Sequence, residues 1–539
     1  MKISGKLVDV HRRAIYGAEV HVEDGIIMSI EEKAVVPDLF LLPGFIDSHV
    51  HIESSMATPG AFAVAAVPHG TIEVVSDPHE IANVLGIDGV MFMLDDSQKV
   101  PMRFSFGAPG CVPATSFESS GAVIDSKAIE VLLADERIGF LSEMMNFPGV
   151  VNSSPEVIAK IRYAKKAGKP VDGHAPGLRG EDLKKYVEAG ITTDHECTTI
   201  EEAMEKISLG MKILIREGSA ARNLGSLHKL IEIAPEMIML CCDDIHPDEL
   251  IERHINGIVT ELLKKGYDLF DVLRAASLNP VNHYKLKSGL LRTGDSADFI
   301  VTDDLAKMNI LQTYIKGELV YSNGKVMFNY ERAGSINNFM SSTISANDIS
   351  HSLGGRKIRV IEAFDGDLFT GNREALVPPN KPSGYNIEID ILKIVVKERY
   401  KDGAPVVAFI KGFGIKEGAM ASSVAHDSHN IIAVGTSDEY ISRVVNRIVE
   451  MKGGLAWSGP EGDLSLPLNI AGIMSSAPVL ETAELYKKIS AAVVNAGSEL
   501  KAPFMTMSFM ALLVIPELKI GDRGLFDVSM FKEVSLLLE

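Results

Sequence analysis

Two histidines, His49 and His51, stand at the end of the short apolar stretch Pro43 to Val50. Residues two positions apart on a β-strand point to the same face, so both imidazoles can reach one divalent cation. The pair predicts a metal site at the end of a buried strand. A single such pair also fits histidines packed in a core, so its meaning depends on what ends the other strands.

Further residues of types that can bind metal ions follow other short apolar stretches, namely Glu143, His174, His195 and Asp243. In a βα barrel the carboxyl ends of the strands meet at one mouth, where reactive side chains gather. Imidazole and carboxylate ligands suit zinc, iron and manganese alike. Four histidines and two carboxylates at this kind of position predict a metal-dependent hydrolase rather than a set of core histidines.

The two carboxylates have distinct predicted roles. Glu143 can bridge two ions that lie about 3.5–4 Å from each other, because each carboxylate oxygen can bind one of them. The alternative is a glutamate that caps a helix or is solvated. Asp243 can bind an ion and also take the proton from a bridging water. Its neighbour Asp244 competes for that role, but alternation along a strand predicts that the Asp244 side chain points the other way.

A second polar cluster, Asp77-Pro78-His79-Glu80, follows another apolar stretch. Pro78 fixes the local turn, so the cluster is predicted to face the same cavity. His79 or Glu80 can pass protons to a leaving group, and the cluster can also bind a further ion. The alternative is that Asp77 caps the helix that follows.

The elements that position these residues repeat a strand followed by a helix over residues 43–287. One helix of the series is predicted over Gly180 to Ala189. About 245 residues of this repetition predict an α/β fold built on a (β/α)8 barrel.

Segments of a different texture flank the barrel. Residues 1–42 and 288–335 alternate apolar and polar positions, as short antiparallel strands do. A stretch rich in Ser, Asn and Gly begins near residue 335 and predicts a linker. Residues 350–539 combine strands with helices such as Ser437 to Lys452, which predicts an additional C-terminal domain of the α+β class, with α/β as the alternative.

The composition excludes several classes of protein. A net charge of −19 opposes binding to nucleic acid or to an anionic membrane, so a small neutral or cationic ligand is expected. No signal-peptide core and no run of roughly 18 apolar residues occurs, so we expect a soluble, cytoplasmic protein. None of the four cysteines forms a C-x-x-C pair, so a disulfide framework is not indicated and a thiolate-zinc deaminase is excluded.

These motifs resemble those of a known family. Residues Pro43 to His51 are similar to the first-strand signature of the amidohydrolase superfamily, and the flanking strand blocks resemble its small β-sandwich. More narrowly, the chain resembles the bacterial and archaeal adenine deaminases over nearly its whole length. The segments that carry this resemblance are His49 to Met56, Ser76 to Glu80, Glu143 to Val150, His174 to Pro176, Asp194 to Glu196 and Ala425 to Asn430.

The resemblance implies hydrolytic deamination of the free base adenine to hypoxanthine and ammonia by a metal-activated hydroxide, in purine salvage or adenine catabolism. It implies two divalent ions, manganese or iron, with zinc as a further candidate. Their ligands would be His49, His51, Glu143, His174, His195 and Asp243. Many superfamily members use a carboxylated lysine as the bridge, but no lysine ends the fourth strand here. An amidohydrolase acting on another cyclic amide or amidine is the alternative.

The resemblance also bears on proton transfer. Asp243 is the expected proton acceptor. Related cytosine-type enzymes place a glutamate three residues after the fifth-strand histidine, but position 177 is a glycine here, so Glu80 is the first choice of proton donor. We also expect a homo-oligomer, specifically a dimer.

Two further histidines, His426 and His429, lie in a polar run directly before an apolar stretch. One hypothesis is a loop that reaches the barrel mouth and covers the substrate. The alternative is a turn held by its own Asp and Asn side chains.

Overall fold

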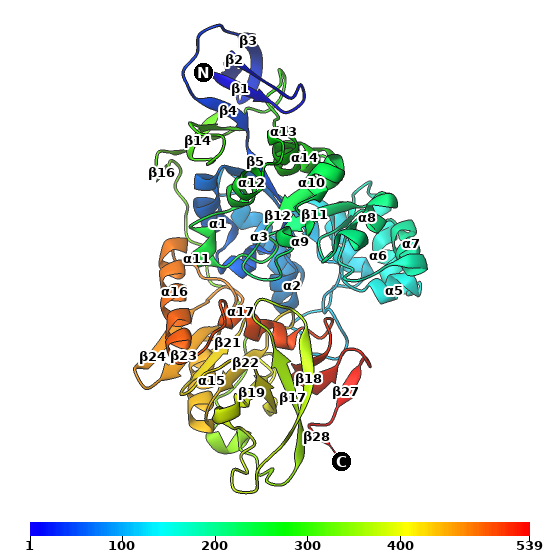
Figure 1. Cartoon of the computed structure of the whole chain (residues 1–539), viewed down its shortest axis with the longest axis vertical. Helices are drawn as coiled ribbons and strands as arrows, with labels where there is room; N and C mark the ends of the chain where they lie inside the picture. Colours follow the sequence, from blue (N-terminus) through cyan, green and yellow to red (C-terminus); the bar gives the residue numbers. More distant parts are fainter. Residues whose placement is uncertain (539) are drawn as a thin grey trace.

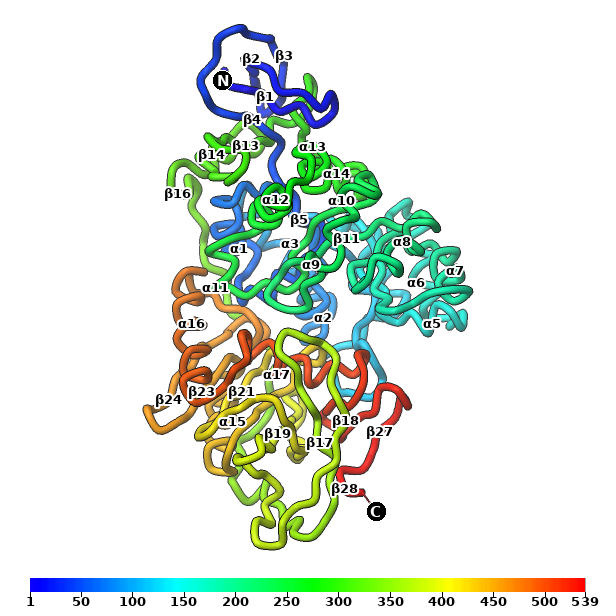
Figure 2. The backbone as a smooth tube through the Cα atoms, in the orientation of Figure 1, coloured from blue at the N-terminus to red at the C-terminus, as the bar shows by residue number. Residues whose placement is uncertain are grey.

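The computed structural model describes residues 1–538 and consists of three parts along its long axis (Figure 1). A small β-sheet domain that holds the N-terminus lies at one end, and a helix-covered barrel lies in the middle. A C-terminal domain lies at the other end. Figure 2 shows the chain leaving the β-sheet domain after β16 and running past the barrel into the C-terminal domain.

The barrel consists of eight parallel strands, as predicted. Five form one hydrogen-bonded sheet in chain order and three form another. The amide N–H of His51 donates to the Asp243 carbonyl at 2.9 Å, and the amide of Asp243 donates to the His49 carbonyl at 2.9 Å, so the last strand meets the first. On the opposite side, the amide of Thr192 donates to the Val171 carbonyl at 2.9 Å and closes the ring.

The barrel strands are β5 (Phe45–Val50), β6 (Thr71–Ser76), β7 (Arg103–Ala108), β8 (Ile138–Met144), β9 (Val171–Gly173), β10 (Thr193–Asp194), β11 (Lys212–Arg216) and β12 (Ile238–Cys241). The helices between and after them are η1 (Ile52–Ser55), α1 (Pro59–Ala66), η2 (Val67–His69), α2 (His79–Leu85), α3 (Ile87–Ser97), α4 (Ser126–Ala134), α5 (Phe147–Val151), α6 (Pro155–Lys166), α7 (Gly180–Ala189), α8 (Ile200–Ser208), α9 (Leu224–Leu227), α10 (Leu230–Ile233), η3 (Pro235–Met237), α11 (Pro247–Leu250), α12 (Ile255–Lys264), α13 (Leu269–Leu273), η4 (Arg274–Leu278) and α14 (Asn279–Tyr284). Helix α7 has the predicted bounds.

The β-sheet domain joins strands from both sides of the barrel sequence in the order β16-β15-β14-β13-β4-β1-β2-β3. Ile27 from one end of this sheet and Tyr314 from near the other belong to the same hydrophobic cluster, so the sheet folds over on itself. Its strands are β1 (Lys2–Asp9), β2 (Ala14–Glu23), β3 (Ile26–Glu32), β4 (Phe40–Pro43), β13 (Phe299–Thr302), β14 (Ile310–Ile315), β15 (Glu318–Ser322) and β16 (Lys325–Val326).

The C-terminal domain is built on a nine-stranded sheet in the order β18-β17-β20-β19-β22-β21-β23-β24, with β28 paired to β17. Its strands are β17 (Lys357–Ala363), β18 (Thr370–Leu376), β19 (Leu392–Lys397), β20 (Val406–Lys411), β21 (Ala419–Ser422), β22 (Ile431–Gly435), β23 (Gly454–Gly459), β24 (Gly462–Pro467) and β28 (Leu537–Leu538). A three-stranded sheet and helices complete it, namely β25 (Leu518–Gly521), β26 (Gly524–Asp527), β27 (Lys532–Val534), η5 (Ala346–Ile349), η6 (Ile387–Ile389), α15 (Asp438–Met451), α16 (Val479–Asn495), α17 (Pro503–Ser508) and η7 (Phe509–Ala511).

Helix α15 shows how the sequence specifies an element of this domain. The side chain of Ser437 accepts a hydrogen bond from the amide of Tyr440 and caps the helix at its start. Ile441, Val444 and Ile448 recur at helical spacing, are buried, and face the sheet. The helix lies over β21, β22 and β23, so it covers the strands that lead into and out of the loop containing His426 and His429.

Two sequence predictions about composition can be compared with the described residues. All four cysteines are buried and free. Within residues 1–538, each helix is too short or too polar to cross a membrane.

A buried lysine ties two barrel loops together. The ammonium group of Lys206 on α8 donates to the carbonyl of Ala175 after β9, to Asp194 at the end of β10 and to Glu202, each at 2.7 Å. Asp194 also accepts a hydrogen bond from the amide of Ala175 at 2.9 Å. Since His174 and His195 adjoin these residues, Lys206 fixes the spacing of two predicted metal ligands.

Replacing Lys206 by Met should lower the free energy of unfolding by about 3–5 kcal/mol, because it leaves the Asp194 carboxylate buried without its cation. Chemical denaturation of the two proteins measures the difference. The matched control is Lys184→Met on the neighbouring helix α7, where the lysine is half-exposed and a change within about 0.5 kcal/mol is expected. Equal effects of the two substitutions would contradict the assignment.

Candidate metal centre

The structure brings the predicted ligands from five strand ends into one buried cluster. His49 and His51 follow the alternation of β5 and both face Asp243, whose Oδ1 lies 3.3 Å from His49 Nε2 and 3.1 Å from His51 Nε2. Each of these side chains is almost inaccessible to solvent. The first and last strands of the barrel therefore present their polar groups to the same point.

Glu143 occupies the place between two groups of possible ligands. Its Oε1 lies 3.5 Å from His51 Nε2, whereas its Oε2 lies 2.8 Å from His174 Nδ1 and 3.2 Å from His195 Nε2. The two oxygens thus face opposite halves of the cluster. A carboxylate placed in this way is able to bridge two cations.

The chemistry of this donor set fits divalent metal ions. The rings of His49 and His195 stack with centroids 4.2 Å apart, and His174 Nε2 is buried without a hydrogen-bond partner among the described residues. Crowded imidazoles with unsatisfied nitrogens are costly to bury unless a cation binds them. Burial alone would raise the pKa of the Asp243 carboxyl, but Arg216 and the adjacent histidines hold that pKa well below its ordinary value.

Sequence reasoning missed a buried arginine in this cluster. Arg216 ends β11, and its Nη1 donates to Oδ2 of Asp243 and to Oε1 of Glu196. Its Nε donates to the Ala221 carbonyl at 2.7 Å, which fixes the guanidinium. Arg216 ends an apolar strand just as the predicted ligands do. Looking for the polar residue at the end of β11 would therefore have identified it.

The prediction that Asp244 points away from the site was wrong. Asp243 has a left-handed backbone conformation, with φ of 59°, so the strand alternation ends before Asp244. Asp244 instead accepts a hydrogen bond from Ser54 and lines the same cavity as Asp243.

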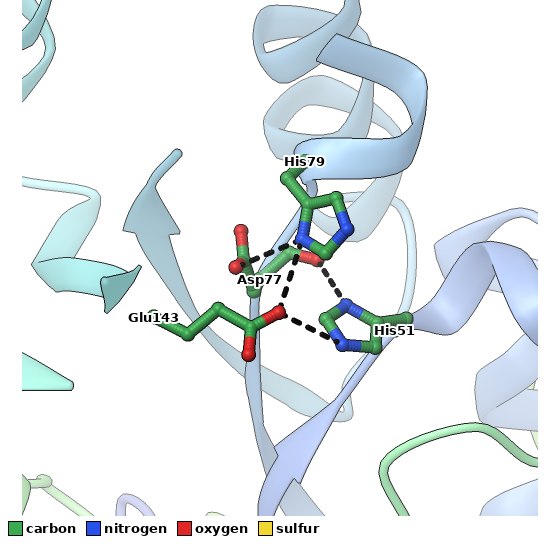
Figure 3. Close-up of side chains that lie close together, drawn as sticks. All are labelled: His51, Asp77, His79 and Glu143. Atoms are coloured by element: carbon green, nitrogen blue, oxygen red, sulfur yellow. Dashed lines mark hydrogen bonds and ion pairs between the residues drawn. The ribbon is translucent and has the colours of Figure 1, made fainter. Parts of the chain in front are cut away.

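The second predicted cluster adjoins the first (Figure 3). His79 Nδ1 lies 3.0 Å from Asp77 Oδ2 and 3.4 Å from Glu143 Oε1, and His51 Nδ1 lies 3.1 Å from the Asp77 carbonyl oxygen. Helix α2 begins at His79 without a side-chain cap, so Asp77 does not act as the helix cap considered above. The cluster instead packs around the Glu143 carboxylate.

Glu80 is held by histidines from the C-terminal domain. His426 Nδ1 and His429 Nε2 each contact one oxygen of the Glu80 carboxylate, and all three side chains are buried. Burial would raise the Glu80 pKa, but the neighbouring histidines hold it well below its ordinary value. Burial lowers the His426 pKa, but Glu80 outweighs it and raises the pKa to about 9. At neutral pH the pair is therefore an ionised glutamate beside a protonated histidine.

The cavity at this site lies between the barrel and the C-terminal domain. Its lining is His51, His79, Glu80, Glu143, Met145, His174, His195, Glu196, Arg216, Asp243, Asp244, Leu368, His426, Asp427, Phe509 and Leu512. Its volume is about 40 Å³, far less than the roughly 300 Å³ of small ligand sites, so side chains must move when a ligand enters. A larger cavity of about 690 Å³ lies at the opposite ends of strands β7 and β8, away from these groups.

Family models and curated relatives match most of this chain. A family model described as the amidohydrolase family matches residues 40–320, and one described as the adenine deaminase C-terminal domain matches residues 368–532. The adenine deaminase of Methanosarcina barkeri is 53% identical over 99% of this chain and 98% of its own length. That of Salinibacter ruber is 51% identical over 100% and 99%. A solved β-aspartyl dipeptidase from Fervidobacterium islandicum is 17% identical with a TM-score of 0.46, covering 61% of this chain and 99% of that chain.

A buried lysine supports one wall of the cavity. Lys519 on β25 is inaccessible to solvent, and its Nζ donates to the carbonyl oxygens of Leu368 at 2.7 Å and Phe509 at 3.0 Å. Burial lowers the pKa of Lys519 to about 7, whereas an unfolded chain would keep it near 10.4. Between these values the unfolded chain binds the proton more strongly, so raising the pH stabilises the folded protein.

The free energy of unfolding of the wild type, measured relative to Lys519→Met, should therefore rise by about 1.4 kcal/mol per pH unit above pH 7. Denaturation at pH 7, 8 and 9 tests this. The control is Lys501→Met, whose side chain is 90% exposed and whose substitution should add no pH dependence. A difference between wild type and Lys519→Met that stays constant over this range would refute the prediction.

Proposed function

This chain belongs to the adenine deaminase family of the amidohydrolases, and we propose that it hydrolyses adenine to hypoxanthine and ammonia at a centre of two divalent metal ions. The observation that carries the proposal is the place of Glu143. Its two oxygens face separate groups of buried ligands, beneath a cavity wall supplied by the C-terminal domain.

The residues proposed to hold the two ions are His49, His51, Glu143, His174, His195 and Asp243, with Glu143 as the bridge. Manganese or iron is the proposed metal, with zinc as a further candidate, since all three accept imidazole and carboxylate ligands. When bound, the ions would lower the pKa of a shared water so that it can attack the purine at neutral pH.

The protein's own groups would move the protons. Asp243 would accept the proton of the attacking water at Oδ1, because Arg216 already binds its Oδ2 and keeps the carboxylate in place. The departing amine needs a proton to leave as ammonia, and we assign its delivery to Glu80 acting with His426. In this pair the proton is stored on the imidazole and passes through the carboxylate. His79 would orient the bridging carboxylate through its contact with Glu143.

The C-terminal domain would cover the reacting base. His426 and His429 lie on the loop between β21 and β22, and both contact Glu80 of the barrel. Since the cavity is too small for a purine, this loop is the proposed lid that opens for substrate entry.

We extend the proposal to the organisation and setting of the enzyme. The proposed domains are a composite β-sandwich from residues 1–42 and 288–335, a barrel from 43–287 and a C-terminal domain from 350–539. Four free buried cysteines suit a reducing compartment, and we propose that the enzyme is cytoplasmic. We also propose that it is a homodimer and that it acts in purine salvage or adenine catabolism.

Removal of metal and of the bridge tests the centre. The wild type, stripped with a chelator and reloaded with manganese, should bind two equivalents and release ammonia from adenine. Glu143→Gln should bind at most one equivalent and lose at least about 100-fold in kcat/KM, because the bridge is needed for both ions. Metal analysis and an ammonia assay measure these quantities.

The matched control for the bridge is Glu73→Gln. Glu73 is also a buried barrel carboxyl, but it hydrogen-bonds Ser288 near the opposite ends of the strands, and burial raises its pKa to about 7. It should retain both ions and its activity. If the fully metal-loaded wild type is inactive with adenine but hydrolyses another cyclic amide or amidine, the proposed substrate is wrong.

Separate replacement of His426 and His429 by Ala tests the lid. Each should lower kcat/KM for adenine about 10- to 100-fold without changing metal content, because each removes a partner of the buried Glu80 carboxylate. His351→Ala is the control, because this histidine of the same domain is partly exposed and does not line the cavity. Steady-state kinetics of the His426 and His429 variants identical to those of the wild type would rule out the lid.

A further inference from the structure

A buried carboxylate on the proposed lid has ion-pair neighbours but no close hydrogen-bond partner among residues 1–538. Asp427 lies between His426 and His429 in sequence but takes no part in their contacts with Glu80. Its side chain is 4% exposed and lines the cavity. Its Oδ1 lies 3.7 Å from His79 Nε2 and 3.9 Å from His426 Nδ1, both too long for a hydrogen bond, and its Oδ2 is buried without a partner among residues 1–538.

The other carboxylates of the cavity differ from Asp427 in this respect. Each of them has a close hydrogen-bonding or ion-pair partner. Glu80 contacts His426 and His429, and Glu143 contacts His174. Arg216 donates to both Glu196 and Asp243, and Ser54 donates to Asp244. Burying a carboxylate without a donor costs free energy that a fold recovers only when something else supplies the donor. In a substrate cavity, the substrate is the source of that donor.

Asp427 lies on the far side of His79 from the proposed centre. The ring of His79 separates it from the proposed centre, since Nδ1 of that ring faces Glu143 at 3.4 Å while Nε2 faces Asp427. If the amine-bearing carbon of adenine lies at the metal ligands, its five-membered ring extends away from them. That ring carries the one N–H that the reaction does not consume.

We propose, on the basis of the function proposed above, that Asp427 accepts a hydrogen bond from the imidazole N–H of the free base and so determines the specificity of the enzyme. Apolar side chains of the same domain, Leu368, Phe509 and Leu512, supply a surface for the purine face. The ring of Phe509 is stacked on that of His426, with centroids 5.0 Å apart. The C-terminal domain would thus recognise the base while the barrel reacts with it.

This arrangement excludes bases substituted on the imidazole ring. A nucleoside, or 9-methyladenine, has no ring N–H to donate, so Oδ2 of the buried carboxylate would stay without a donor beside the added carbon. A site built to bond a substrate N–H rejects analogues that lack it far more strongly than a site that only measures size.

The experiment compares kcat/KM for adenine and 9-methyladenine in wild type, Asp427→Ala and Asp427→Asn. The wild type should prefer adenine by about 100-fold or more. Asp427→Ala should lose about 30-fold or more on adenine and little on 9-methyladenine, which reduces the preference to about 5-fold or less. Asp427→Asn keeps the shape of the side chain and one acceptor oxygen, so its preference should lie between those of the wild type and the alanine variant, which guards against a folding defect in the alanine variant.

Glu118→Gln is the matched control. Glu118 is a buried carboxyl that contacts Ser428 of the same loop but does not line the cavity, and burial raises its pKa well above the ordinary value, so glutamine mimics it closely. Its preference should equal that of the wild type.

Two results would overturn the assignment of Asp427. The first is an unchanged preference in the Asp427 variants, and the second is an equal loss on both substrates, which is the signature of proton transfer rather than recognition. A metal-loaded wild type that binds adenine without releasing ammonia would instead refute the proposed function. Calorimetric binding of adenine and 9-methyladenine to the same variants then tests Asp427 by itself.

Discussion

Burial of many ionisable groups at one end of the barrel is the constraint on which the rest of the structure depends. Carboxylates and imidazoles that lose their water must be compensated by opposite charges, by hydrogen bonds or by ions. Lys206 compensates Asp194, Arg216 compensates Asp243, and Nε2 of His254 lies 3.0 Å from Asp47. These partners surround the proposed ligands and hold them in place, so the electrostatic compensation and the geometry of the site have the same physical origin.

The C-terminal domain belongs to this charge network. Without it, the carboxylate of Glu80 would lose the two histidines that contact it from the loop between β21 and β22. Arg399 holds the same loop in place. It is inaccessible to solvent and donates a hydrogen bond to the carbonyl oxygen of His429 at 3.3 Å. The domain therefore completes a site whose other half lies in the barrel, and it supplies most of the apolar side chains of the cavity wall.

The barrel and the gathering of the candidate ligands at its mouth could be predicted from the sequence because they depend on local patterns. Short apolar strands that end in His or Glu are visible in a single sequence, and so was helix α7. The direction of Asp244 could not be predicted, because it follows from a left-handed residue at Asp243 rather than from strand alternation. Phe509 was not identified as a cavity residue, because only tertiary packing brings a position so distant in sequence to the barrel mouth.

Closure of the barrel has a consequence for biosynthesis. The backbone bonds that join the first strand to the last run between His49, His51 and Asp243, three of the residues proposed to bind metal. Nearly two hundred residues separate the first two from the third. A nascent chain emerging from the ribosome therefore cannot assemble the full ligand set until its eighth barrel strand has been synthesised and has docked. Partly translated chains therefore present at most an incomplete set of the proposed ligands.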